Sequence, residues 1–512
     1  MKCVLKIFVL IITIAVLGSC KKLIEPKVYS TLTDGNAFIT KSDAIAAVNA
    51  TYSRLKQPSG ISDSWMYYAG FQITVSDLTT DAGHASSGGD VGLMSSCQWG
   101  PTNQYIAYAW QFPYKMISDA NNSIYYINKM ESVTDAEKKQ FLGELRFLRA
   151  LGYVDLTDAF GPVILLTEDS VAKNIANPDY EAPLPVSPVE QINTLIISDL
   201  EYAIANLPVN YSGTTVYNSN DVGRATKGAA LMLLCKLFMR EHEWQKALDA
   251  ANQIIALNQY SLFSSYAGLF AESNKWCSEN IFSALADQLV DGVEIKNHFG
   301  PLNNTVITDR WQYFGLPWRM FNTYELNDDR REMYFYTYVG TDGLTYKQGP
   351  PGQTTPPAGE YYLSDVATKK FADPNGPDNY LDGHVFPIFR YADVLLCKAE
   401  ALNELNGPSA ESINLINQVK GRSHATLLGA ASAFTKESLR SSILQERGWE
   451  FVFECKRRQD LLRMGVYPQM VNEYLTAAGL TPSINLAKDK YFPYPQSQVD
   501  LNPNLSNADR RN

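Results

Sequence analysis

Two pairs of short helices, far apart in the chain, restrict the fold more than any other feature of this sequence. The first pair is expected within Asp221–Leu262, with a break near residues 240–243, and the second within Arg390–Ser423. Both contain apolar helical runs, LMLLCKLF in the first and VLLCKAEAL in the second. A helix with an apolar face must bury that face against a neighbour, so the sequence predicts a scaffold of packed helices.

The pattern Trp244-Gln-Lys-Ala-Leu248 opens the second helix of the first pair, after a run of small residues. It resembles a tetratricopeptide helix pair, a unit of about 34 residues. Because the two pairs are not adjacent, we predict a mainly α fold in which a tetratricopeptide-like helical-repeat scaffold carries large loop-rich insertions. The expected scaffold covers residues 41–56, 105–262 and 386–465, and the expected ligand-facing loops cover residues 57–104 and 269–386.

A further helix, expected within Phe141–Thr167, has recognisable ends. Thr134-Asp-Ala-Glu137 has the pattern of a capping box, and Gly161-Pro162 stops the helix. Four charged residues lie within it: Arg146, Arg149, Asp155 and Asp158. They are candidates for a functional site or for a brace between packed helices. The lack of catalytic partners favours the brace.

Two more helices have sequence signals of their own. A second capping box, Ser187-Pro-Val-Glu190, predicts a helix that runs to about Leu207. A strong helical pattern over Ser438–Arg463 predicts one continuous helix near the C-terminus.

The N-terminus has the features of an export signal. Lys2 and Lys6 precede the apolar run Ile7–Leu17, which is too short to span a bilayer. Leu17-Gly-Ser-Cys20 then resembles a bacterial lipobox, in which the chain is cleaved before the cysteine and the thiol is acylated. We therefore expect a signal peptide at 1–19, lipid attachment at Cys20, an extended leader over 20–40 and a single domain over 41–512. An ordinary secretory signal with an unrelated cysteine is the alternative.

Charge and cysteine content exclude two classes of protein. The formal net charge is −10, and neutralisation of phosphate by Lys and Arg dominates nucleic-acid binding, so we do not expect nucleic acid as a partner. Of the 7 cysteines, we expect Cys3 to be removed and Cys20 to be acylated. The remaining cysteines are odd in number and scattered along the chain, which argues against a disulfide-stabilised fold. A Cys97–Cys277 bridge is an alternative to free thiols.

No catalytic or metal-binding motif is present in the sequence. It has no G-x-S-x-G, H-E-x-x-H or Walker loop, and its 5 histidines lack partners at metal-ligand spacing, so we expect no catalytic residue, metal or cofactor. Asp328-Asp329 beside Arg330-Arg331 suggests paired carboxylates for glycoside hydrolysis, but a salt-bridged turn is favoured. Asp77 and Asp81 suggest a cation site, and a loop cap is favoured.

Aromatic residues in the loop-rich segments give the clearest chemical signal. A sugar ring has an apolar C–H face and a polar rim, which suit a flat aromatic ring with amide groups beside it. The candidate ligand-binding residues are Trp99, Asn103, Trp311, Tyr313 and Trp318. Ordinary core packing is the alternative for each ring.

Several long segments, in order along the chain, carry a family resemblance. They include RFLRALGYVDLTDAFGPVILLT, GRATKGAALMLLCKLFM, FPIFRYADVLLCKAEALNEL, ILQERGWEFVFECKRRQDLLRMG and PYPQSQVDLNPNLSN. In these segments the chain resembles the SusD/RagB family of nutrient-binding outer-membrane lipoproteins. It departs from the family at Ile164, where proline is frequent, which affects the shape of one loop.

The resemblance implies a function without catalysis. Such a protein lies at the cell exterior, lipid-anchored to the outer membrane, and delivers oligosaccharides to a SusC-like TonB-dependent transporter. Some members of the family take peptides instead. Ligand residues do not carry over, because ligand binds on variable loops. A lipid-anchored glycoside hydrolase and a periplasm-facing adaptor with only protein partners are the alternatives.

Overall fold

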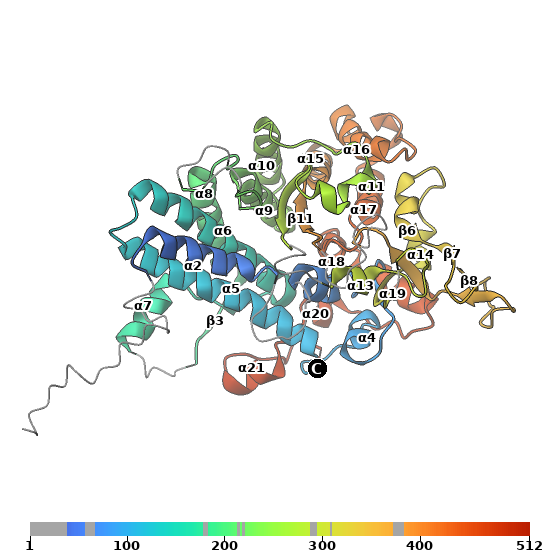
Figure 1. Ribbon diagram of the computed structural model, residues 1–512, viewed down its shortest axis with the longest axis horizontal. Helices are drawn as coiled ribbons and strands as arrows, with labels where there is room; N and C mark the ends of the chain where they lie inside the picture. The colour runs from blue at the N-terminus through green and yellow to red at the C-terminus, as the bar shows by residue number, and fades with distance from the viewer. Residues whose placement is uncertain are drawn as a thin grey trace, which may run out of the picture.

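The computed structural model confirms the mainly α fold (Figure 1). It describes residues 38–56, 67–177, 183–211, 216–217, 221–286, 294–307, 310–371 and 383–511. The predicted signal peptide, the acylated Cys20 and most of the leader lie outside these residues. In the described part of the chain, no helix combines the length and the apolar character needed to cross a membrane.

The helices of the scaffold pack on one another in chain order, so that α5 contacts α6, α6 contacts α8, and α8 contacts α9. The scaffold helices are α2 (Lys41–Ser53), α5 (Gln104–Lys129), α6 (Asp135–Phe160), α8 (Val189–Asn206), α9 (Lys227–Arg240), α10 (Trp244–Ala256), α15 (Tyr391–Asn406), α16 (Ala410–Arg422), α17 (Lys436–Glu450), α18 (Arg457–Arg463) and α19 (Tyr467–Ala477). The two predicted helix pairs are confirmed as α9–α10 and α15–α16. Because α10 packs directly on α15, the long insertion between them does not interrupt the stack.

Helix α6 has the predicted ends. The side chain of Thr134 accepts from the Glu137 backbone N–H, and Glu137 accepts from the backbone N–H of Thr134, which completes the capping box. At the other end Gly161 has φ 69°, a conformation that favours glycine. Gly152 lets α6 approach α5 closely, since a Cβ there would lie 3.0 Å from Ile117 Cγ1. Local sequence therefore determined the length of this helix.

The four charges of α6 are braces, as predicted. Arg149 donates two hydrogen bonds to the buried Asp199 of α8, at 2.7 and 2.8 Å. Asp158 pairs with Arg240 of α9 at 2.7 Å, and the Arg146 guanidinium lies 4.3 Å from the centre of the Tyr202 ring. The remaining charge, Asp155, accepts from the hydroxyls of two tyrosines at 2.9 and 3.1 Å.

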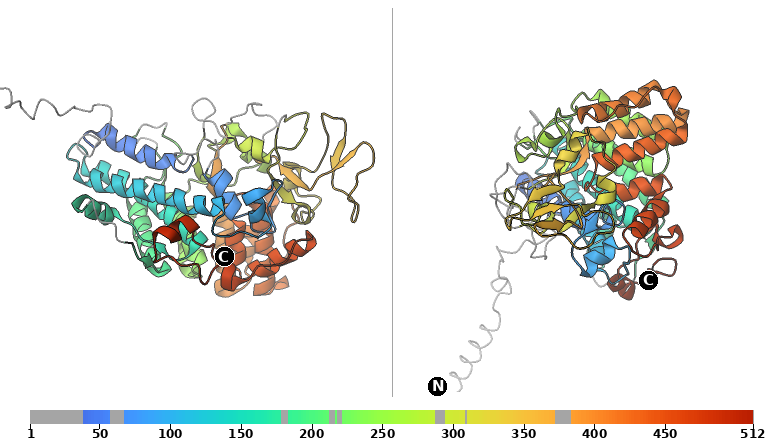
Figure 2. Two further views of the ribbon diagram at one scale, coloured as in Figure 1. Left: turned by 90° about the horizontal axis from the view of Figure 1, so that it is seen from below. Right: turned by 90° about the vertical axis from the view of Figure 1, so that its right-hand side faces the viewer.

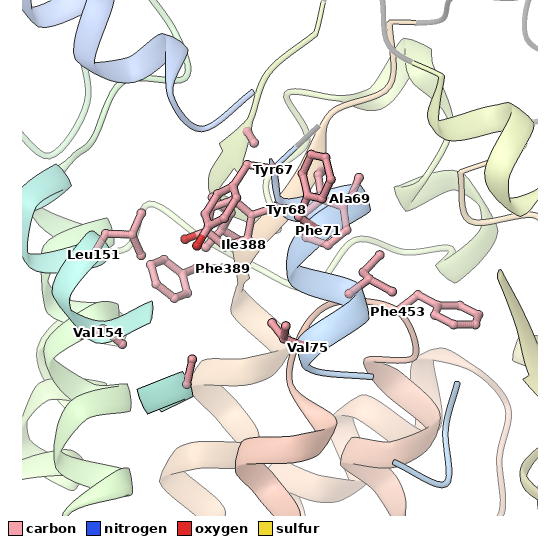
Figure 3. Close-up of a cluster of buried hydrophobic side chains, with 14 of the residues drawn as sticks. Tyr67, Tyr68, Ala69, Phe71, Val75, Leu151, Val154, Ile388, Phe389 and Phe453 are labelled. Atoms are coloured by element: carbon pink, nitrogen blue, oxygen red, sulfur yellow. The ribbon is translucent and has the colours of Figure 1, made fainter. Parts of the chain in front are cut away.

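Those two tyrosines, Tyr67 and Tyr68, belong to a short π-helix, η2 (Tyr67–Gln72), at the junction of scaffold and insertion. Figure 3 shows them beside Ile388 and Phe389, with Leu151 and Val154 of α6 beyond Phe389. The expectation that residues 57–104 form only loops is therefore wrong. Within this range the structure has η2, α3 (Ile73–Val75), β1 (His84–Ala85) and α4 (Gly89–Ser95), and most of their apolar side chains are buried.

Two other predictions of local structure are wrong. Pro188, not Ser187, occupies the N-cap position of α8, and proline has no side-chain acceptor, so no capping box forms there. The single helix predicted over Ser438–Arg463 is two helices, α17 and α18. The chain turns between them where Phe453 and Cys455 have φ 57° and 58°, and Cys455 N–H donates to Asp77 Oδ2 at 2.8 Å. A partner distant in the sequence thus holds a break that helical periodicity does not reveal.

The insertion between α10 and α15 contains short strands rather than loops alone. Their bounds are β4 (Asn280–Ala284), β5 (Phe314–Pro317), β6 (Tyr334–Phe335), β7 (Thr337–Val339), β8 (Thr345–Lys347), β9 (Glu360–Tyr362), β10 (Asp365–Thr368) and β11 (Phe386–Arg390). Strands β1, β5, β10 and β6 form one antiparallel sheet in that order, and β4 pairs with β11. Strands β7–β9 form a separate sheet that projects from the body (gold in Figure 2).

Short elements complete the described chain. They are β2 (Val163–Ile164), α7 (Glu168–Ala176), β3 (Val186–Ser187), α11 (Tyr266–Leu269), η3 (Glu272–Asn274), α13 (Ile295–Phe299), α14 (Trp318–Phe321), η4 (Asp329–Met333), η5 (Ala431–Ala433), α20 (Leu486–Asp489) and α21 (Gln496–Leu501). Strands β2 and β3 pair just beyond the C-terminal end of α6.

A buried ionic cluster joins the insertion to the scaffold. It comprises Glu279, Arg330 and Lys370 of the insertion and Arg390, Arg422, Glu446, Glu450 and Glu454 of the strand and helices that follow. Glu450 lies at its centre and accepts from Arg330 at 3.1 Å and from Arg390 at 2.9 Å. Burial alone would raise the pKa of Glu450, but the three arginines around it lower that pKa to about 2.

Candidate functional site

A row of five aromatic side chains lies where the N-terminal end of α5 meets the segment before β5. We call Tyr108, Tyr105, Tyr313, His298 and Trp311 the aromatic row. The rings of Tyr108 and Tyr105 are 6.2 Å apart, and the Tyr105 and Tyr313 hydroxyl oxygens are 3.3 Å apart. The His298 ring then lies 5.8 Å from Tyr313 and 5.5 Å from Trp311. Helix α5, helix α13 and the segment before β5 thus contribute to one continuous set of rings.

Four of the five rings are buried or half-buried, and the last ring of the row, Trp311, is exposed. Tyr105 and His298 are buried, Tyr108 and Tyr313 are half-buried, and the Trp311 side chain is 42% exposed. Packed rings at one end fix the geometry, while the ring at the other end presents apolar surface to solvent. Burial raises the pKa of Tyr105, so its hydroxyl stays protonated and able to donate a hydrogen bond at neutral pH.

The backbone between Trp311 and Tyr313 is held in an unusual conformation. Gln312 has φ 43°, which is rare for a residue with a side chain. Its side-chain amide donates to both the backbone oxygen and Oδ1 of Asp365, each at 3.0 Å. Asp365 is itself buried and lies 2.6 Å from His84 Nδ1. These contacts hold Trp311 and Tyr313 in place, because Gln312, the strained residue between them, is anchored to β10.

A close approach of two strands makes this anchor possible. Gly315 on β5 faces Asp365 on β10, and a Cβ at Gly315 would lie 1.7 Å from Asp365 Oδ1. No other residue fits at that position without moving the carboxylate. On the β1 side of the sheet, the Ser86 hydroxyl donates to the Gln312 backbone oxygen at 2.7 Å.

Of the five predicted ligand-binding residues, the structure brings Trp311 and Tyr313 together. Asn103 lies at the base of the row as the N-cap of α5, where its side chain accepts from the Tyr105 N–H at 2.9 Å. Trp318 lies elsewhere, with its indole N–H donating to the Leu363 backbone oxygen at 2.9 Å. The prediction of an exposed platform is wrong for Trp99. Its side chain is 2% exposed, because the C-terminal segment covers it, with the Phe492 ring 5.1 Å away.

Three members of the row were not predicted. Tyr105 and Tyr108 lie three residues apart at the start of a helix, a spacing that places both rings on one face. That spacing is a usable signal, although it does not distinguish core packing from a site. His298 has no signal in the local sequence, since its role depends on two rings that come later in the chain.

The acidic residues that were candidates for catalysis or cation binding have structural partners. Asp328 pairs with the buried Arg330 at 2.7 Å, which confirms the salt-bridged turn. Asp81 pairs with Arg457 at 2.7 Å, and Asp77 accepts from the backbone at the α17–α18 break. Among the described residues no group of three or more His, Cys, Asp or Glu side chains is placed to hold a metal ion. Cys97 and Cys277 are both free thiols, so the alternative of a bridge between them is wrong.

Comparison with known families gives two matches, which together cover about four fifths of the chain. Residues 296–509 match the SusD family, and residues 42–239 match a family described as starch-binding and associating with the outer membrane. A SusD-like protein of Formosa agariphila is 26% identical over 441 residues, which cover 80% of this chain and 79% of the relative. The starch-binding protein SusD of Bacteroides thetaiotaomicron is 23% identical, with 81% of this chain and 80% of the relative covered.

Solved structures with the same fold include two from Bacteroides thetaiotaomicron. A SusD homolog has a TM-score of 0.75 at 22% identity and covers 93% of this chain and 98% of its own. Surface glycan-binding protein A, in complex with laminarihexaose, has a TM-score of 0.71 at 22% identity and covers 90% of this chain and 97% of its own. At this level of identity the likeness establishes the fold.

Proposed function

Since this chain belongs to the SusD/RagB family, we propose that it is a cell-surface glycan-binding lipoprotein that captures an oligosaccharide and delivers it to a SusC-like TonB-dependent transporter. The proposal includes no catalytic step, and two of the candidate carboxylates, Asp328 and Asp81, are held in ion pairs. A lipid on Cys20 would tether the domain to the outer membrane.

The exposed Trp311 ring at the end of the aromatic row is the observation that carries the ligand proposal. A sugar ring stacks its C–H face on an indole, and the gain is greatest when the indole is already held in its bound orientation. Here His298 and the anchored Gln312 provide that orientation. The half-buried Tyr313 beside it offers a second ring and a hydroxyl for the sugar rim.

Oligosaccharide is favoured over peptide by the chemistry of this surface. The row presents aromatic faces and hydroxyls, and it has no exposed sheet edge within it that would add a peptide strand. Two relatives with this fold are named for glucan ligands, laminarihexaose in one and laminarin in the other. These names make β-glucans reasonable first members of a test panel.

Isothermal titration calorimetry of the folded domain tests the proposal. The panel contains laminarihexaose, maltoheptaose, xylohexaose, mannohexaose and a mixed-sequence hexapeptide. We expect at least one glycan to bind with a Kd near or below about 1 mM, which corresponds to about −4 kcal/mol. Trp311→Ala should weaken that binding at least about tenfold, or about 1.4 kcal/mol, because the stacking face is removed.

The matched control is Tyr361→Ala. Tyr361 is also an exposed ring, at 40%, but it lies on the projecting β7–β9 sheet and not in the row. Normal binding by Trp311→Ala would refute the site, and binding of the peptide alone would refute the ligand class. A separate experiment tests the delivery role. We expect a transporter to be recovered from outer membranes together with the intact protein, and not with Cys20→Ala, which lacks the tether.

A further inference from the structure

A second recess lies at the C-terminal end of α2 and shares no lining residue with the aromatic row. It is a groove of about 340 Å³, within the range typical of small-ligand sites. The last turns of α2, residues 221–224 and the end of β4 form its walls. The polar or charged side chains along it include Asn49, Ser53, Lys56, Arg224 and Ser283. We call it the α2 groove.

An exposed tryptophan lies next to Gly223, one of the residues that line the α2 groove. The Trp276 side chain is 48% exposed, and it lies against Gly223. A Cβ at Gly223 would lie 3.0 Å from the indole and 2.6 Å from Leu285 Cδ1, and Gly223 has φ 93°. Only glycine allows the loop to pass this close, so the sequence brings a flat apolar ring to the edge of a polar groove.

A buried hydroxyl on the β4 side of the groove has no partner within the described residues. Ser283 is 5% exposed, yet its Oγ forms no hydrogen bond there. The backbone of Ser283 is fixed, because β4 pairs with β11 at this position. A buried hydroxyl without a partner costs free energy, and a rotation of the Ser283 side chain toward a ligand hydroxyl in the groove would recover that cost.

Arg224, which also lines the groove, is held in place by several polar contacts. Arg224 donates to Asn49 Oδ1 at 2.7 Å and to Glu144 Oε2 at 3.2 Å, and its Nε lies 3.7 Å from Asp221 Oδ1. Its guanidinium also stacks 3.6 Å from the centre of the Tyr217 ring. With Glu144 and Asp221 beside it, Arg224 has part of its charge balanced and offers oriented N–H groups, which suit the hydroxyls of a neutral ligand.

We propose that the α2 groove is a second carbohydrate-binding site, which takes one or two units of a neutral sugar. The C–H face of a pyranose would lie on Trp276, and its hydroxyls would bond Ser283 and Arg224. The site does not depend on the ligand proposed for the aromatic row. With two separate sites, one protein holds a glycan at two points, and the effective concentration of the second contact raises the overall affinity for long chains.

The test uses the folded domain carrying Trp311→Ala, which removes the exposed ring of the aromatic row and so weakens binding there. Saturation-transfer NMR and titration of tryptophan fluorescence are run with laminaribiose, cellobiose, maltose and galactobiose, and with glucuronate as the charged comparison. We expect at least one neutral disaccharide to bind, and glucuronate to bind at least tenfold more weakly. Adding Trp276→Ala should weaken the disaccharide at least tenfold.

A second variant tests whether the ligand occupies the groove itself, independently of the Trp276 ring. Ser53 is exposed on the last turn of α2 and lines the groove, so Ser53→Phe fills the space without touching the core. Ser441 on α17 is also exposed and also donates to a backbone oxygen one turn earlier, which makes Ser441→Phe the matched control. Loss of binding in Ser53→Phe but not in Ser441→Phe supports the site.

Three results would overturn the proposal: no disaccharide binds the Trp311→Ala protein, binding survives Ser53→Phe, or glucuronate binds as well as the neutral probes. The melting temperatures of the three groove and control variants show whether each is folded. Because every arm lacks the Trp311 ring, none of these results bears on the function proposed for Trp311.

Discussion

Replacement of Arg149 by alanine is expected to destabilise the protein strongly and to leave glycan binding intact. Arg149 is 1% exposed, and its guanidinium holds the fully buried Asp199 carboxylate by two hydrogen bonds. It also donates to Asn121 at 2.7 Å and to the partly exposed Glu168. Removal of the arginine leaves a carboxylate in the core between α6 and α8 without its main partner.

Removing one partner of a buried ion pair costs about 3–5 kcal/mol, most of it from the charge left behind. Arg146 already lies 3.6 Å from Asp199 Oδ1 and can move toward it, which places Arg149→Ala near the lower limit, about 3 kcal/mol. Removing both charges is far less costly. Arg149→Met combined with Asp199→Leu should therefore recover most of the loss, because no buried charge remains unpaired.

Urea denaturation followed by circular dichroism measures the free energy of unfolding of the wild type, the single variant and the double variant. Calorimetry with the glycan panel then compares their affinities. The reasoning is wrong if Arg149→Ala unfolds at the same urea concentration as the wild type and loses ligand. It is also wrong if the double variant is no more stable than Arg149→Ala, since the stranded charge would then not be the cause.

Three further predictions concern other buried or terminal groups. Trp99→Ala should cost about 3–5 kcal/mol of stability in urea, with unchanged glycan affinity where the protein is folded, because the ring is core and not platform. Burial raises the pKa of Asp155 from 3.8 to about 7, so the folded state keeps a proton that the unfolded state releases, and stability falls as pH rises through this interval. Asp155→Asn should flatten the pH dependence of the melting temperature between pH 4 and 7. Thr134→Ala should cost about 1 kcal/mol in urea through loss of the α6 cap.

Features set by neighbouring residues could be predicted from the sequence, and features set by distant residues could not. The ends of α6 and the pair α9–α10 follow from caps, a glycine stop and local periodicity, and they were predicted closely. The break between α17 and α18 depends on Asp77, and the burial of Trp99 depends on Phe492. Each of those partners lies hundreds of residues away, where periodicity carries no information.

The same distinction applies to the candidate site. Trp311 and Tyr313 were found because residue type alone suggested a ring beside polar groups. Nothing in the local pattern indicated that Gln312 between them takes a left-handed conformation anchored to Asp365. The orientation of the two rings is a product of the β5–β10 pairing, and it becomes visible only when the sheet is assembled.

The buried ionic cluster limits how the ligand-facing insertion can be exchanged between relatives. Glu279, Arg330 and Lys370 enter the cluster from the insertion, and their counter-ions enter from β11, α16, α17 and the turn that follows α17. A recombination that replaced the whole stretch from α11 to Lys370 would import three charges that must match five already fixed in the scaffold. Exchanges confined to the segment between Arg330 and Lys370, such as the projecting β7–β9 sheet, avoid that requirement. Changes in sequence and length within the insertion are therefore expected to be tolerated better between these two residues than around them.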